Sequence, residues 1–238
     1  MTTDPLLLTG EVDDATARLV RTAGGFDAAE LAAASLLPGW TRGHVLTHLA
    51  RNADGFVNLL TAARTGEQVP MYASAAARSA DIEAGASRPL AAHLDDLRRA
   101  ADRFVEAVAA MPAEAWTATV ETPRGSRVAA ELVWGRLREV EVHHVDLAAG
   151  HRPEDWPEAF GHRLLHEVAA DLAGRTDVPA MVLRFDGTRH ELVIGDPEGA
   201  PRVTGPAAEL AAWLIGRSRG DVLTVTPDGH LPTPPEWI

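Results

Sequence analysis

Apolar residues recur at helical spacing through the first 150 residues and in short alternating runs after them. Side chains three or four residues apart share one helix face, whereas strand side chains alternate between two faces. This change in the spacing of apolar residues constrains the fold most. It requires packed helices in the first part and a mixture of helices and strands in the second. We therefore expect two domains, residues 1–152 and residues 153–238.

Turn and capping residues divide the first part into four long amphipathic helices. Thr41 follows a Pro-Gly turn and is a plausible N-cap, and Gly150 is typical of a helix C-terminus. Four helices with connections of these lengths predict an antiparallel bundle with some long crossovers. The expected helices span residues 9–23, 41–65, 90–110 and 128–149.

The second part predicts a small α/β domain, which makes the overall fold class α+β. Two β-type runs are separated by Asp186-Gly187-Thr188, which is a hairpin signal. We expect strands at residues 180–185, 190–194 and 221–226, and helices at residues 157–174 and 206–215.

Charge and hydropathy restrict the partners. The net charge is -12, and the acidic residues are spread along the chain, which argues against nucleic acid or an anionic membrane and favours a small-molecule ligand. No apolar run approaches the roughly 20 residues that span a bilayer, and the N-terminus lacks a signal-peptide pattern. We expect a cytoplasmic protein, either a monomer or a small homo-oligomer.

Two residue types are missing from the sequence. The chain has no cysteine, so it offers no thiolate ligand and no nucleophilic thiol of its own. It has no lysine either, since all 22 basic residues are arginine, which excludes Schiff-base catalysis through a lysine amine. Any thiol chemistry must therefore come from a bound cofactor.

Two polar stripes lie on helices that should be buried in the bundle. The second predicted helix carries His44 and His48, and the fourth carries Glu139, His143 and Asp146 at i, i+4 and i+7. Bundle cores build metal sites from Glu and His on facing helices, because a cation compensates the buried charge. Two imidazoles and one carboxylate suit zinc and leave one coordination position open, as in catalytic sites.

Each stripe also has an ordinary interpretation as a surface ion pair or a solvated helix face. Within the metal hypothesis, His143 and His144 are adjacent and point about 100° apart, so both cannot be ligands on one helix face. The spacing from Glu139 favours His143.

Two helix motifs and several shorter segments resemble the mycothiol-dependent maleylpyruvate isomerase family, whose metal-binding bundle belongs to the DinB-like superfamily. The resemblance extends over nearly the whole chain. The segments that carry it are Leu37-Pro38-Gly39-Trp40-Thr41-Arg42-Gly43-His44, Thr47-His48-Leu49-Ala50, Pro70-Met71-Tyr72, Ala77-Arg78, Trp134 with Arg136, Arg138-Glu139-Val140-Glu141-Val142-His143-His144-Val145-Asp146-Leu147, Gly216-Arg217 and Pro234-Pro235-Glu236-Trp237-Ile238.

The resemblance implies an N-terminal DinB-like four-helix bundle with a smaller C-terminal α/β domain. It implies that zinc, or another divalent metal, is held by His48, Glu139 and His143. It also places the family's functional arginine at Arg217, expected to bind a substrate carboxylate. Arg78 and Arg136 are weaker candidates for substrate binding.

The implied reaction converts maleylpyruvate to fumarylpyruvate in gentisate degradation, with mycothiol as the thiol cofactor. A thiolate that adds to the cis double bond turns it into a single bond, and elimination after rotation leaves the trans isomer. A zinc-dependent mycothiol S-transferase on the same scaffold remains an alternative. A non-catalytic binding module with a structural metal is another, although such sites usually have four ligands, often cysteines.

Overall fold

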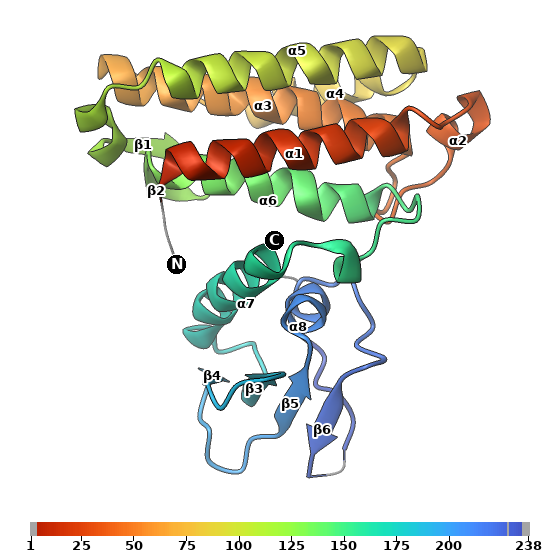
Figure 1. Cartoon of the computed structure of the whole chain (residues 1–238), viewed down its shortest axis with the longest axis vertical. Helices are drawn as coiled ribbons and strands as arrows, with labels where there is room; N and C mark the ends of the chain where they lie inside the picture. The colour runs from red at the N-terminus through yellow and green to blue at the C-terminus, as the bar shows by residue number, and fades with distance from the viewer. Residues whose placement is uncertain (1–3, 228, 235–238) are drawn as a thin grey trace. The chain divides into compact units, whose positions relative to one another are not determined.

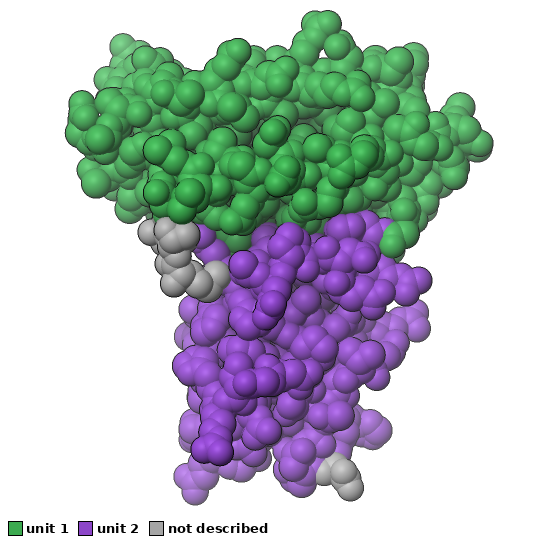
Figure 2. All heavy atoms as spheres, viewed as in Figure 1, with its two compact units in different colours: residues 1–150 green, residues 151–238 purple. Residues whose placement is uncertain are grey.

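The computed structural model describes residues 4–227 and 229–234 (Figure 1). It divides into two compact units, residues 1–150 and residues 151–238, coloured green and purple in Figure 2. A helical first unit and an α/β second unit confirm the predicted fold class. Of the segments that resemble the family, residues 235–238 lie outside the described part of the chain.

From residue 4 onward, unit 1 has six α-helices, a short 3-10 helix (η1) and a two-stranded hairpin. Four long helices, α1, α3, α5 and α6, lie alongside one another (Figure 1). The elements, in chain order, are α1 (Pro5–Ala23), α2 (Ala28–Ala32), α3 (Arg42–Thr65), α4 (Ala75–Ala86), α5 (Leu90–Ala109), η1 (Ala113–Thr117), β1 (Thr119–Thr122), β2 (Gly125–Val128) and α6 (Glu131–Asp146).

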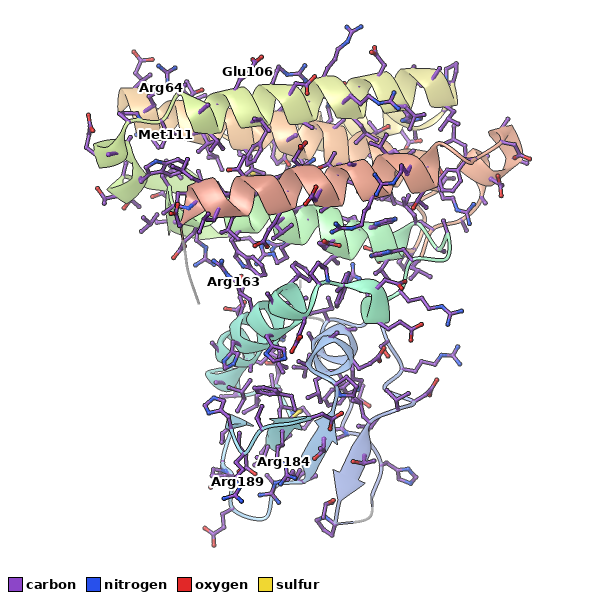
Figure 3. All side chains as sticks on the ribbon, viewed as in Figure 1. Arg64, Glu106, Met111, Arg163, Arg184 and Arg189 are labelled. Atoms are coloured by element: carbon purple, nitrogen blue, oxygen red, sulfur yellow. The ribbon has the colours of Figure 1, made fainter. Side chains whose placement is uncertain are left out.

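The direction of each long helix follows from the residues it pairs with. Ion pairs join Arg51 of α3 to Asp96 of α5 and Asp54 of α3 to Arg103 of α5, so α3 and α5 run in the same direction. Arg64 and Met111, near the C-terminal ends of these helices, accordingly lie at the same end of the bundle (Figure 3). The predicted antiparallel arrangement is therefore wrong for this pair, and residues 66–89 form the long crossover.

Helix α3 runs antiparallel to α6, and this pairing positions the polar residues in unit 1. His48 of α3 lies opposite His143 of α6, whereas Asn52, one turn further along α3, lies opposite Arg136, earlier in α6. Residues one turn apart on α3 and about two turns apart on α6 therefore form successive layers of polar contacts between the helices.

Local capping chemistry sets the ends of α3. Thr41 accepts a hydrogen bond from the His44 amide, and the His44 side chain accepts one from the Thr41 amide, which closes a capping box. At the other end Gly66 adopts a left-handed conformation with φ of 74°. The structure confirms the predicted N-cap and end of this helix.

The described residues of unit 2 form two α-helices beside a four-stranded sheet, together with a short 3-10 helix (η2). The strand order is β4-β3-β5-β6, with β3 and β5 parallel and the two outer pairings antiparallel. Helices α7 and α8 pack against each other and against the sheet. The elements are η2 (Pro153–Asp155), α7 (Glu158–Ala173), β3 (Met181–Phe185), β4 (Glu191–Ile194), β5 (Arg202–Gly205), α8 (Ala207–Leu214) and β6 (Thr224–Thr226).

Several elements differ from the sequence expectations. Helix α6 is shorter than predicted at both ends, because Gly125–Val128 pairs with β1 and Ala148 turns left-handed with φ of 51°. Helices α2 and α4, the β1-β2 hairpin and β5 were not expected. None of the helices in the described part of the chain is long and apolar enough to cross a membrane.

Candidate metal centre

Three side chains from two helices converge in unit 1. His48 Nε2 lies 3.1 Å from Glu139 Oε2 and 3.1 Å from His143 Nε2, and the last two atoms are 3.5 Å apart. One ligand atom from each residue lies within 4.8 Å of the others. The structure thus brings together the three residues that the sequence suggested as metal ligands.

These distances fit a metal ion. Tetrahedral zinc with bonds of about 2.0–2.1 Å separates its ligand atoms by about 3.3 Å, and the three separations of 3.1 to 3.5 Å bracket that value. Within the described residues, no other group of His, Asp or Glu brings three ligand atoms so close together.

The site is buried on one side and accessible on the other. The His48 side chain is 4% exposed, whereas those of Glu139 and His143 are 16% and 15% exposed. The Trp40 ring lies 5.6 Å from the His48 ring and helps to cover it. Three ligands with partial access leave room for a further ligand from solution, which is typical of a catalytic metal site.

Burial and mutual hydrogen bonding set the charges of the three side chains. Burial lowers the pKa of His48 to about 4, so its imidazole is neutral. Burial by itself would raise the pKa of Glu139, but hydrogen bonds from His143 and His48 hold that pKa well below its usual value. A positive neighbour stabilises an anionic carboxylate in a buried place, and a divalent cation would provide one.

Asp146 orients one of the three ligands. Its carboxylate is completely buried and lies 2.8 Å from His143 Nδ1. Burial would lower the pKa of His143, but the hydrogen bonds to Asp146 and Glu139 outweigh it and raise that pKa to about 8. With Nδ1 engaged by Asp146, Nε2 of His143 faces the centre. The i+3 spacing from His143 was the sequence signal for this contact.

Arg78 lies beside the centre. It comes from α4, and its Nη2 lies 3.1 Å from His48 Nδ1. Its guanidinium carbon is 5.6 Å from the centre of the Tyr72 ring. The structure therefore brings this weak sequence candidate close to the proposed ligands, where its positive charge is available to an anion.

Arg136 lies deeper in unit 1 and is 1% exposed. It donates hydrogen bonds to the Leu49 carbonyl and to Asn52 Oδ1, at 2.9 and 2.8 Å. Burial lowers its pKa to about 10, so it stays charged at neutral pH. These contacts favour a role in positioning Asn52, and substrate binding by Arg136 remains a prediction.

Arg217 lies in unit 2, just after α8. Gly216 turns left-handed with φ of 74° and ends the helix, and Arg217 Nη1 donates to the Ile215 carbonyl at 2.8 Å. The side chain is partly exposed. Its expected role in substrate binding remains a prediction.

The two other histidines near the centre make different contacts. His44 caps α3, and its Nε2 lies 3.2 Å from Glu83 of α4. His144 is buried on another face of α6, where Nε2 lies 2.8 Å from Thr22 Oγ1 of α1. The helical offset between His143 and His144 thus directs one toward α3 and the other toward α1.

Comparisons with known proteins point to the same family in both parts of the chain. Residues 12–148 match the mycothiol maleylpyruvate isomerase N-terminal domain, and residues 155–236 match the MDMPI C-terminal domain. Two solved structures, the mycothiol-dependent maleylpyruvate isomerase and a histidine-to-alanine mutant of it, superpose with TM-scores of 0.92 and 0.91. Each is 30% identical, with 100% of both chains covered. No curated protein matches the sequence.

Proposed function

Because the chain belongs to the mycothiol maleylpyruvate isomerase family, we propose that it converts maleylpyruvate to fumarylpyruvate with mycothiol as cofactor. This reaction would serve gentisate degradation, in the catabolism of aromatic compounds. A reducing cytoplasm suits an enzyme that depends on a small thiol, and we propose that location.

One observation carries the proposal: the convergence of His48, Glu139 and His143 at 3.1 to 3.5 Å in a partly accessible site. We propose that these three residues hold zinc. When bound, the metal would supply a Lewis acid that lowers the pKa of the cofactor thiol, and the thiolate can add to and leave a conjugated double bond.

The side chains around the triad have separate tasks in this proposal. Asp146 fixes the ring of His143, and Arg78 places a positive charge beside the centre. Maleylpyruvate is a dianion, and arginines bind carboxylates through paired hydrogen bonds. Arg78 would hold a carboxylate beside the centre while the middle of the molecule rotates. We also propose that Arg217 binds a substrate carboxylate.

The activity test follows substrate and thiol together. Purified protein loaded with zinc is incubated with maleylpyruvate and either mycothiol or glutathione. We expect fumarylpyruvate to form with mycothiol while its free thiol concentration stays constant. Stoichiometric loss of the thiol would instead indicate the mycothiol S-transferase. Absence of any maleylpyruvate turnover by zinc-loaded protein would overturn the substrate assignment.

Replacing Arg217 tests its proposed role. Arg217→Ala removes a guanidinium that would bind a substrate carboxylate, and we expect turnover to be lost while zinc affinity stays unchanged. The neighbouring exposed arginine gives the matched control Arg219→Ala, which should keep full activity. Steady-state kinetics and zinc titration measure the two effects. Equal activity of both variants would contradict the role.

A further inference from the structure

We propose that Tyr72 is a catalytic residue, whose hydroxyl donates a hydrogen bond to the substrate carbonyl oxygen that gains negative charge during isomerisation. The inference rests on the proposed function and adds a residue to it. Tyr72 is the single tyrosine of the chain, and it lies in the connection between α3 and α4.

Close packing fixes the backbone next to Tyr72 on α3. A Cβ on Gly55 would lie 2.8 Å from Met71 Cγ, so only glycine lets Met71 approach the helix so closely. Asn58 Nδ2 also donates to the Met71 carbonyl at 3.3 Å. Gly55 lies about two turns beyond His48 on α3. The connection is therefore anchored to the helix that carries the first proposed ligand.

Side-chain contacts hold the Tyr72 phenol beside the centre. The guanidinium of Arg78 lies over its ring. Arg78 also contacts His48 Nδ1, so one guanidinium contacts both the phenol and a proposed ligand. The ring of Tyr72 lies under that guanidinium, 5.6 Å from its carbon.

The chemistry of this neighbour restricts how the phenol is used. Arginine has only hydrogen-bond donors, so Arg78 cannot accept the O–H of Tyr72. The phenol O–H is therefore left for an acceptor other than Arg78.

The protonation state of the Tyr72 phenol agrees with its role as a hydrogen-bond donor. Burial raises the pKa of Tyr72, against the smaller lowering effect of the neighbouring Arg78. The phenol therefore keeps its proton at neutral pH. It can donate a hydrogen bond, and it is not suited to act as a base.

The reaction needs such a donor. Rotation requires the π electrons of the double bond to move onto the conjugated carbonyl oxygen while a nucleophile forms a new bond to carbon. The π electrons return from the oxygen to the double bond when the nucleophile leaves with the electron pair of its bond to carbon. No proton is gained or lost overall, so a hydrogen bond to the oxygen is sufficient. One positioned donor of this kind contributes about 10²–10³ in rate.

The test is Tyr72→Phe in the full-length, zinc-loaded enzyme. We expect kcat to fall by about 10²–10³, with a much smaller change in KM, because the hydrogen bond strengthens only as charge develops. Zinc affinity and melting temperature should match the wild type. The control Thr117→Val removes an exposed hydroxyl of the same unit and should leave kcat unchanged. A Tyr72→Phe kcat within twofold of the wild type would overturn the proposal.

A spectroscopic measurement separates this proposal from the assigned reaction. Because Tyr72 is the single tyrosine, 3-fluorotyrosine incorporated during expression labels this site alone. Saturated maleylpyruvate, which cannot isomerise, should shift its fluorine resonance on binding. A resonance that stays fixed while calorimetry detects binding would contradict contact between Tyr72 and the ligand. Failure of the wild-type activity would instead count against the proposed function.

Discussion

At the residue scale, the buried carboxylate of Asp146 has the most specific task. It is joined to Nδ1 of His143 at 2.8 Å and leaves the other ring nitrogen facing the centre. Carboxylates behind metal-bound histidines fix the tautomer and raise the basicity of the ligand. Replacing Asp146 should therefore lower metal affinity more than it lowers the stability of the fold.

Asp146→Asn keeps the shape of the side chain but removes its charge. We expect zinc affinity to fall by about 10- to 100-fold, because the ring of His143 loses its charged partner. Isothermal calorimetry with zinc measures the effect, and the exposed Asp14→Asn on α1 is the matched control. Unchanged affinity in Asp146→Asn would contradict this role.

His93 is a second buried residue with a measurable signature. It is completely buried on α5, and burial lowers its pKa, as does the nearby charge of Arg88. The folded protein therefore keeps His93 neutral at a pH at which the unfolded chain already takes up a proton. Its contribution to stability is present above about pH 6.5, the ordinary histidine pKa, and is lost as the pH falls below that value.

His93→Gln should weaken the pH dependence of stability. We expect the free energy of unfolding of the wild type to decrease more than that of the variant between about pH 8 and about pH 5.5. Urea unfolding at the two pH values gives both quantities. Equal losses in the two proteins would show that His93 does not contribute.

At the element scale, glycine contacts decide where α4 lies. A Cβ on Gly43 of α3 would be 2.1 Å from the Ala86 carbonyl oxygen, and one on Gly85 of α4 would be 2.5 Å from Thr47 Cγ2. These contacts let α3 and α4 approach closely. Since Arg78 is on α4, the same packing carries its side chain to His48.

Gly43→Ala should push α4 away from α3. Alanine normally stabilises a helix interior by about 1 kcal/mol relative to glycine, but the clash with backbone oxygen should destabilise the protein by about 1–3 kcal/mol. Activity should fall because Arg78 is displaced. Gly10→Ala in α1, where nothing lies within 4 Å of the new Cβ, is the control and should be neutral or stabilising. Urea unfolding compares the two variants.

At the scale of the whole molecule, metal and stability are linked through unit 1. A ligand that binds only the folded state stabilises it by mass action, about 2.7 kcal/mol at 100 times its Kd. His48 comes from α3 and the other two proposed ligands come from α6, so zinc would join two helices that are far apart in sequence.

Zinc should therefore raise the melting temperature of the wild type and not that of Glu139→Gln, which lacks the charged ligand. Thermal unfolding with zinc and with a chelator measures the shift. Glu106→Gln, an exposed carboxylate on α5 (Figure 3), is the control and should respond to zinc like the wild type. Equal zinc-induced shifts in Glu139→Gln and the wild type would contradict the proposed ligand set.

The sequence by itself determined the features that depend on local chemistry. Thr41 and Gly66 define the ends of α3 because capping involves residues within one turn. The spacing of Glu139 and His143 predicts one shared helix face for the same reason. The segment motifs also identified the family, which the comparisons confirm.

Only the tertiary structure decided which polar stripes meet. Helix α4 has a weak sequence pattern and is held by contacts with α3, so Arg78 beside His48 could not be read from spacing. The helices α3 and α5 run parallel because a long crossover connects them. The helical spacing of apolar residues does not predict that connection. Contacts between residues far apart in the chain form only when helices pack, and packing brought Arg136 to Asn52 and Arg78 to Tyr72.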